Sequence, residues 1–165
     1  MYSEIHTGDW WWTMQVRAGF FVIPIIFGSD ETHLTNYSGD KAIWPLYISI
    51  GNLPSDIRNA PTSLGWELAA LLPIPPKHAG GPQKVIDAAN KDFAAGIQSA
   101  LAIILKPLVK LFEDGIKVHG EMGKVYQRGF PVVCGWLADF PEYGKLLNLR
   151  KDMCPICEVK LSKLG

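Results

Sequence analysis

Two aspartates that each follow a long apolar run are the residues of this chain best suited to metal chemistry. Asp30 ends the stretch Phe20 to Asp30, FFVIPIIFGSD, whose seven large apolar residues indicate a strand buried on both faces. Asp139 follows a second such run, Phe130 to Ala138. A carboxylate where a rigid strand meets a loop is well placed to bind a metal or a substrate. An acid after a Gly-Ser pair is also an ordinary turn residue, so both interpretations of Asp30 stay open.

A Cys-x-x-Cys motif, CPIC, forms the second candidate site with Cys154 and Cys157. This spacing directs two thiolates at one ion and supplies half of a tetrahedral Zn²⁺ site, which needs two more ligands. The candidates for those ligands are His6, His33, His78, His119 and Cys134. Two reduced thiols without a metal are the alternative, while a redox pair lacks the usual strand-to-helix context. Three cysteines, an odd number, argue against a disulfide framework.

Basic side chains provide candidate contacts to a DNA backbone, although most exposed basic residues simply stay solvated. These candidates are Arg58, Lys145, Arg150 and Lys151. His33, three residues after Asp30, is either a phosphate ligand or a loop histidine without a function. The formal net charge is zero, but residues 1–83 hold four Lys/Arg against seven Asp/Glu and residues 84–165 hold twelve against nine. This asymmetry permits a phosphate-facing surface without a global basic field.

Three consecutive tryptophans, Trp10 to Trp12, lie in the segment GDWWWTMQ after Asp9, which is suited to cap a short helix. The three indoles cannot all be exposed to solvent, so we expect them to pack in the interior. The alternative is a stacking platform for nucleobases.

The composition indicates one globular domain, because 165 residues that are 48% hydrophobic and 19% charged can bury a sizeable core. No apolar run reaches the length of about 18 residues that a membrane span needs, since Lys106 and Lys110 interrupt the longest one. The start, MYSEIHTGDWWW, lacks the pattern of a signal peptide. The sequence therefore favours a nuclear or cytoplasmic protein that is not secreted, with no membrane partner and no small-molecule substrate.

Two more strands follow the first in the strand-rich half of the chain, residues 1–72. Lys41 to Leu53 is apolar and β-branched, and Leu64 to Ile74 is apolar and bounded by prolines. Residues 73–83, PIPPKHAGGPQ, read as a linker because four prolines and two glycines exclude regular structure. A helix and a fourth strand then occupy residues 84–140, and the Cys-x-x-Cys tail occupies residues 141–165.

The segment from Lys84 to Val118 is predicted to be a long amphipathic helix. Its apolar stripe, at steps of three and four, consists of Phe93, Ile97, Leu101, Ile104, Leu108, Leu111 and Phe112. Pro107 should kink or divide the helix, and Gly115 or Gly120 should end it. Residues 119–129 are predicted to form a turn before the fourth strand.

This order of elements predicts an α/β fold with a ribonuclease H-like core: three antiparallel strands, a long helix, and a fourth strand parallel to the first. In that arrangement the ends of the first and fourth strands are adjacent, so Asp30 and Asp139 would lie side by side. Two neighbouring carboxylates repel each other unless a cation lies between them, which predicts a Mg²⁺ site. A pair of Mg²⁺ ions about 3.5 to 4 Å apart would activate a water or hydroxyl and stabilise the leaving oxygen of a phosphodiester.

Five motifs extend across nearly the whole chain: GDWWWTMQ, IIFGSDETHLTNYSGDKAIWPLYISIGNLPSDIR, LLPIPP, FPVVCGWLADFPEYG and CPIC. Together they resemble the Plavaka-type transposases of mushroom-forming fungi, relatives of the CACTA transposases, and the block from Ser29 to Arg58 is the most specific part. The resemblance implies a DDE-type enzyme, in which two aspartates and a glutamate bind Mg²⁺ and the ends of the DNA element are cut and rejoined. Asp30 matches the first of these acids and Asp139 the second.

The chain departs from this family pattern at its end. The family's third acid lies well downstream of the Cys-x-x-Cys motif, whereas Glu158 is the only acid after that motif here. The approach to the first strand, QVRAGFFVIP, looks shorter than in relatives, and Glu121-Met122-Gly123 represents an acid-Gly motif only loosely. We therefore expect a truncated catalytic core that is inactive on its own.

Two other hypotheses remain open at this stage. One is a non-catalytic, domesticated fragment that binds DNA or a protein partner through its Trp-rich or basic surface. The other is a small structural module stabilised by zinc.

Overall fold

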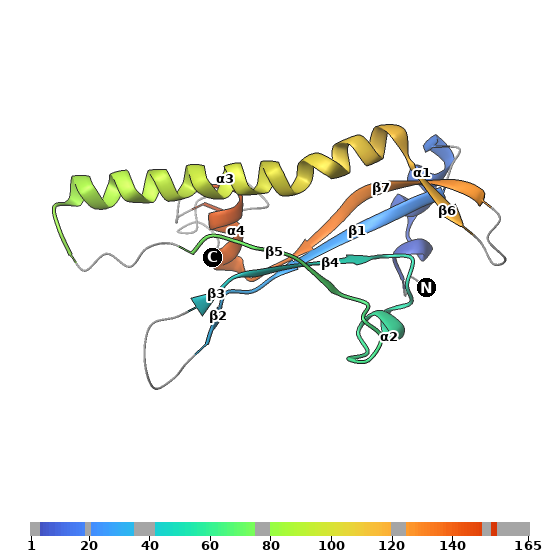
Figure 1. Cartoon of the computed structure of the whole chain (residues 1–165), viewed down its shortest axis with the longest axis horizontal. Helices are drawn as coiled ribbons and strands as arrows, with labels where there is room; N and C mark the ends of the chain where they lie inside the picture. Colours follow the sequence, from blue (N-terminus) through green and yellow to red (C-terminus); the bar gives the residue numbers. More distant parts are fainter. Residues whose placement is uncertain are drawn as a thin grey trace. The chain divides into compact units, whose positions relative to one another are not determined.

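The computed structural model describes residues 4–18, 21–34, 42–74, 80–119, 125–149 and 153–154, which form a mixed α/β fold (Figure 1). One sheet has five strands in the order β5-β4-β1-β7-β6, and a second sheet pairs β2 with β3. In chain order the elements are η1 (Ile5–Thr7), α1 (Asp9–Ala18), β1 (Phe21–Ser29), β2 (Thr32–His33), β3 (Ala42–Ile43), β4 (Pro45–Ile50), α2 (Ser55–Arg58), β5 (Glu67–Leu71), α3 (Gln83–Asp114), β6 (Ile116–His119), β7 (Val125–Leu137) and α4 (Phe140–Leu146).

The chain divides into two compact units. The first unit consists of Met1–Gly28, Tyr47–Ala69 and Leu105–Leu137. The second unit consists of Ser29–Leu46, Ala70–Ile104 and Ala138–Gly165. The two candidate acids, Asp30 and Asp139, both belong to the second unit.

Strands β1 and β7 run side by side and parallel in the first unit (Figure 1). Their register extends from Phe21 opposite Gly129 to Gly28 opposite Leu137. Strand β1 is buried continuously from Val22 to Phe27, which confirms the expectation of a strand covered on both faces. The parallel pairing of the first and fourth predicted strands is also confirmed.

The second predicted strand runs antiparallel to the first. The Gly51 N–H, just after β4, donates a hydrogen bond to the Pro24 carbonyl, and Asn52 Nδ2 donates to the Val22 carbonyl. The end of β4 therefore lies beside the start of β1, as an antiparallel pair requires. The order of the four predicted strands across the sheet is third, second, first, fourth, with β6 added at the edge.

The connection between the long helix and the fourth strand was predicted incorrectly. Helix α3 ends at Asp114, directly before Gly115, which confirms one of the two glycines predicted to end it, although the helix does not extend to Val118. The error lies in the segment that follows, because β6 comes after the helix and pairs antiparallel with β7. Strand β7 begins at Val125, within the segment predicted to be a turn. The reason is local: Gly115 adopts a φ of +66°, which ends the helix and starts a strand too short to show a pattern of its own.

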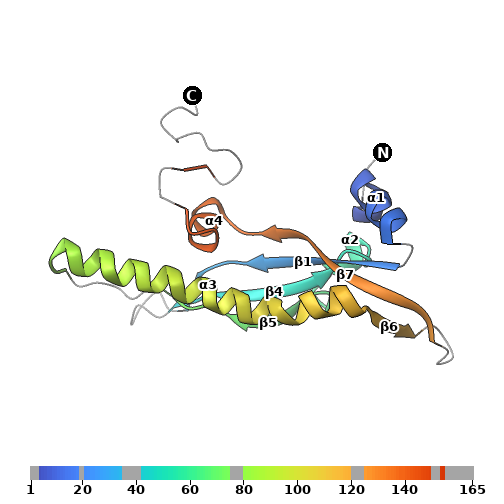
Figure 2. The same cartoon turned by 90° about the horizontal axis from the view of Figure 1, so that it is seen from above.

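The sequence predicts that Pro107 kinks or divides the long helix, and of these two effects the division does not occur, because α3 is continuous from Gln83 to Asp114 (Figure 2). The predicted stripe is the less exposed face of the helix, with Ile97 fully buried. Ile103 and Val109, off that stripe, are 73% and 59% exposed. Phe112 is the exception within the stripe, because 51% of its surface is exposed.

By length and composition alone, α3 is apolar enough to cross a membrane. It reaches this length and mean hydropathy although Lys106 and Lys110 interrupt its apolar run, as the sequence indicates. One such helix is weak evidence for a membrane segment.

The three consecutive tryptophans do not share one environment. Trp11 is buried, whereas Trp10 is 41% and Trp12 is 60% exposed. The expectation of interior packing holds for Trp11, and two neighbouring indoles are left accessible to a ligand.

Replacing Gly96, inside α3, and Gly115, just after α3, by alanine should change the free energy of unfolding in opposite directions. A Cβ at Gly115 would come within 2.5 Å of Arg128 Cγ at a left-handed φ, so Gly115→Ala should lower the free energy of unfolding by about 1 to 2 kcal/mol. A Cβ at Gly96, inside the helix, meets nothing within 4 Å, so Gly96→Ala should raise it by about 0.5 to 1 kcal/mol. Urea unfolding of both variants measures the contrast, and equal effects would contradict it.

Glu4 joins the first residues of the chain to α2 and should make stability depend on pH. Its Oε1 accepts hydrogen bonds from Ser55 Oγ at 2.6 Å and Ser55 N at 2.9 Å. These two bonds, with smaller contributions from the charges of Arg58 and His6, hold the pKa of Glu4 below its ordinary value of 4.5. The stabilisation is therefore present above pH 4.5 and is lost as the pH falls through the lowered pKa of the folded state.

The difference in melting temperature between the wild type and Glu4→Gln should accordingly shrink on acidification below pH 4.5. Thermal unfolding followed by circular dichroism between pH 7 and pH 3 measures this difference. A difference that stays constant over that range would show that Glu4 does not contribute through its charge.

Candidate functional site

The two predicted acids, Asp30 and Asp139, come shortly after the parallel strands β1 and β7 in the chain. Gly28 opposite Leu137 is the last pair of the register, and Asp30 and Asp139 each stand two residues beyond it. Neighbouring strands of a sheet lie about 4.8 Å apart, so these two positions would be neighbours if the register continued beyond its last pair. Both carboxylates belong to exposed residues.

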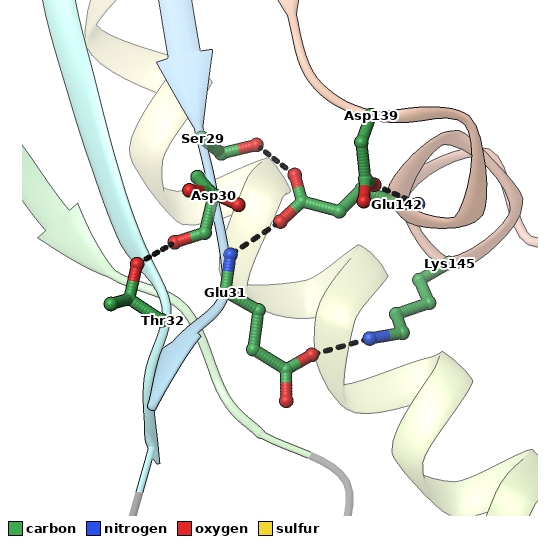
Figure 3. Close-up of polar contacts among 7 residues, drawn as sticks. All are labelled: Ser29, Asp30, Glu31, Thr32, Asp139, Glu142 and Lys145. Carbon is green, nitrogen blue, oxygen red and sulfur yellow. Dashed lines mark hydrogen bonds and ion pairs between the residues drawn. The ribbon is translucent and has the colours of Figure 1, made fainter. Parts of the chain in front are cut away.

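Glu142 joins the two segments that carry the acids (Figure 3). Its Oε2 accepts a hydrogen bond from Ser29 Oγ at 2.7 Å, and its Oε1 accepts one from the Glu31 N–H at 2.7 Å. The residues on both sides of Asp30 are therefore held by one side chain. Glu142 is only 3% exposed, so these bonds form away from water, where a lost partner is costly.

Asp139 has a structural role in addition to its position. It is the N-cap of α4, and its Oδ1 accepts a hydrogen bond from the Glu142 N–H at 2.9 Å. Pro141 suits the first turn, where a missing N–H costs nothing. At the other end of α4, Gln98 Nε2 donates to the Leu146 carbonyl at 2.8 Å. Both ends of this short helix are thus fixed within the second unit.

Lys145 is engaged by its own unit. Its Nζ forms an ion pair with Glu31 Oε2 and lies 5.1 Å from the ring centroid of Trp44, a fully buried residue. The ion pair links α4 to the residue after Asp30 a second time (Figure 3). A DNA phosphate would have to compete with Glu31 for this ammonium group, so its predicted contact to DNA stays a prediction.

The other predicted contacts are only partly within the described residues. Arg58 donates from Nη1 to the Leu53 carbonyl in the first unit, and His33 is exposed on β2. Arg150 and Lys151 lie outside the described residues. So does Cys157, while Cys154 is half-buried, so the geometry of the Cys-x-x-Cys pair stays a prediction.

The carboxylate oxygens of Asp30 and Asp139 are donors that suit a hard cation such as Mg²⁺ better than Zn²⁺. In the part of the chain that the structure describes, no three His, Cys, Asp or Glu side chains form a group that would hold a metal. The Asp30 carboxylate makes no hydrogen bond or ion pair with the other described residues, and Asp139 uses one oxygen for the cap. Mg²⁺ keeps several waters and accepts one or two protein carboxylates, so two aspartates fit it.

Glu142 was missed in the sequence, although a signal for it exists. Asp139-Phe-Pro-Glu142 has the D-x-x-E spacing of a capping box, in which the acid at the third helical position bonds back to the cap. Here the glutamate instead reaches the end of β1, over a hundred residues away in sequence. Sequence spacing reveals the helix start but not this distant partner.

The fold and the site define a mixed α/β protein with two accessible aspartates at the ends of neighbouring parallel strands. A family model described as Plavaka transposase matches residues 1–165, and the chain belongs to that family. No curated protein and no solved structure matches the chain.

Replacing Glu142 tests its role as the link between the two segments. In Glu142→Gln an amide NH₂ must face one of two donors, so the variant should lose about 2 kcal/mol of unfolding free energy. Glu113→Gln, at an exposed position of α3, is the matched control and should change it by less than about 0.5 kcal/mol. Urea unfolding measures both variants, and an equal response would show that the Glu142 bonds do not stabilise the fold.

Proposed function

We propose that this chain is a segment of the catalytic core of a DDE-type DNA transposase with a ribonuclease H-like arrangement. The strand order and the parallel pairing of β1 with β7 support that arrangement. Membership of the Plavaka transposase family supports DNA, and transposon ends in particular, as the substrate of the full-length enzyme. The observation that carries the proposal is the Glu142 side chain, which joins the segments of Asp30 and Asp139.

In this proposal Asp30 and Asp139 are the two ligands that the chain offers to Mg²⁺. When bound, the ion supplies Lewis-acid activation of a water or hydroxyl at a phosphodiester. Glu142 is a positioning residue, because both of its oxygens are engaged by Ser29 and Glu31. The exposed Asp30 carboxylate is the more available of the two acids, since Asp139 also caps α4.

A non-catalytic role in DNA binding is the second candidate function. A non-catalytic role is favoured because a DDE site uses three acids. Among the described residues, no group of three possible metal ligands is found. We therefore expect the 165-residue chain to bind Mg²⁺ weakly and to leave DNA uncut. Nicking of plasmid DNA that Asp30→Asn abolishes would exclude this second candidate.

Binding of Mn²⁺, a paramagnetic substitute for Mg²⁺, tests the proposed ligands directly. Asp30→Asn and Asp139→Asn should each weaken Mn²⁺ binding about tenfold or more, since each removes one of two anionic oxygen ligands. Asparagine is also a good N-cap, so Asp139→Asn should retain α4. Electron paramagnetic resonance of free Mn²⁺ during a titration measures the affinities.

Asp92→Asn, at an exposed position of α3, provides the matched control for the loss of one charge. It should leave Mn²⁺ binding unchanged within about twofold, because screened charges on the surface act weakly. The proposal fails if Asp92→Asn weakens Mn²⁺ binding as much as Asp30→Asn does.

A further inference from the structure

A cavity in the first unit lies outside the site described above. Its volume is about 490 Å³, and all of its lining residues belong to the first unit. They come from the start of the chain, from α2 and the segment after it, and from β1 and β7. This volume falls within the range of about 300 to 1,000 Å³ that small organic ligands occupy.

Two indoles form aromatic walls of the cavity. Trp10, the first of the three consecutive tryptophans, lines it with 41% of its surface exposed. Trp66 lines it as well, and its ring lies close to Gly28, because a Cβ at Gly28 would be 3.3 Å from Trp66 Cζ3. Trp66 Nε1 also donates to Asn59 Oδ1 at 3.4 Å. Trp66 therefore lies beside Gly28 and is hydrogen-bonded to Asn59.

The β7 side of the cavity is open and chemically inert. A Cβ at Gly135 would meet no atom within 4 Å, so the absence of a side chain there leaves space. Cys134 donates its thiol hydrogen to the Ile25 carbonyl at 3.3 Å, and burial raises the pKa of this thiol. A thiol that stays protonated is a poor metal ligand and a poor nucleophile.

The charges in the cavity balance each other. Glu4 and Arg58 both line it, with opposite charges, and each is anchored by the protein: Glu4 by Ser55 and Arg58 by the Leu53 carbonyl. A phosphate group, which needs a net positive site, gains little here. The Asn59 amide retains donor hydrogens beside the two indoles and can bond the polar edge of a flat, neutral ring.

We propose that this cavity binds one unpaired nucleobase of DNA. The base stacks on the indoles of Trp10 and Trp66, and its polar edge faces Asn59. A nucleobase combines a flat π-face with hydrogen-bonding edges and no charge, which are the properties that these walls recognise. The inference rests on the proposed function, in which the chain contacts DNA, and it adds an unpaired base as the form of DNA recognised.

Binding of two matched DNA duplexes tests this site. The 165-residue chain is titrated against a fluorescein-labelled duplex with a single unpaired adenine and against the same duplex fully paired, both in EDTA. The wild type should prefer the first duplex about tenfold, because stacking one base on aromatic side chains contributes a factor of this size. Fluorescence anisotropy measures both affinities.

Three variants locate the preference in the cavity. Trp10→Ala removes one indole and Gly135→Leu fills the open space, so each should reduce the preference to about twofold or less. Trp12→Ala removes a neighbouring indole that is 60% exposed and does not line the cavity, and it should keep the wild-type preference. Circular dichroism spectra that match the wild type show that each variant is folded.

The outcomes separate this inference from the proposed function. Equal wild-type affinity for both duplexes, or equal effects of Trp10→Ala and Trp12→Ala, would overturn the nucleobase site. So would cross-linking that places a peptide side chain or a second copy of the chain in the cavity. The Mn²⁺ titration at Asp30 and Asp139 is independent of these results, so the metal proposal can stand when the nucleobase site fails.

Discussion

The arrangement of the candidate site depends on one buried carboxylate. Glu142 accepts hydrogen bonds from Ser29 and Glu31, on either side of Asp30, while its own N–H is held by Asp139. Glu142 is 3% exposed, so water does not readily replace a lost hydrogen bond. Separating the two segments would leave a donor unsatisfied, and the free-energy cost of that donor keeps the segments together. The ion pair between Lys145 and Glu31 adds a second, more exposed link between the same two segments. Two acids that are far apart in sequence are held in a fixed relation by polar bonds in addition to the packing of strands.

The segments that carry Asp30 and Asp139 continue from two strands whose register is fixed by parallel pairing. Strands β1 and β7 are parallel and leave the sheet at the same level, and a bulge beside Ile25 absorbs one extra residue, Cys134. Without that bulge the register would be shifted by one residue, and Gly28 would no longer lie opposite Leu137. The apolar run of β1 is buried at six consecutive positions, Val22 to Phe27, so hydrophobic burial fixes the strand that positions the first acid.

Much of this fold is predictable from local patterns, and the rest depends on contacts that no local pattern contains. The apolar runs before Asp30 and Asp139 identify two strands, and the stripe around Ile97 identifies the long helix. Only the first strand is buried as predicted, because Val133 and Leu137 of β7 are 48% and 58% exposed. Strand β6 escapes prediction because it is four residues long and exists through its pairing with β7. The linking role of Glu142 cannot be predicted from local patterns, because its partners Ser29 and Glu31 are distant in sequence. The sequence locates candidate acids, and tertiary hydrogen bonds decide what holds them.

The proposed metal site requires that Asp30 and Asp139 hold the same divalent ions. A crystal of the chain soaked in Mn²⁺ and measured at the manganese absorption edge tests this claim most directly. The account predicts an anomalous peak bonded to oxygens of both carboxylates. A peak bonded elsewhere, or carboxylates more than about 8 Å apart, which is too far for ions about 3.5 to 4 Å apart to bridge, would contradict it.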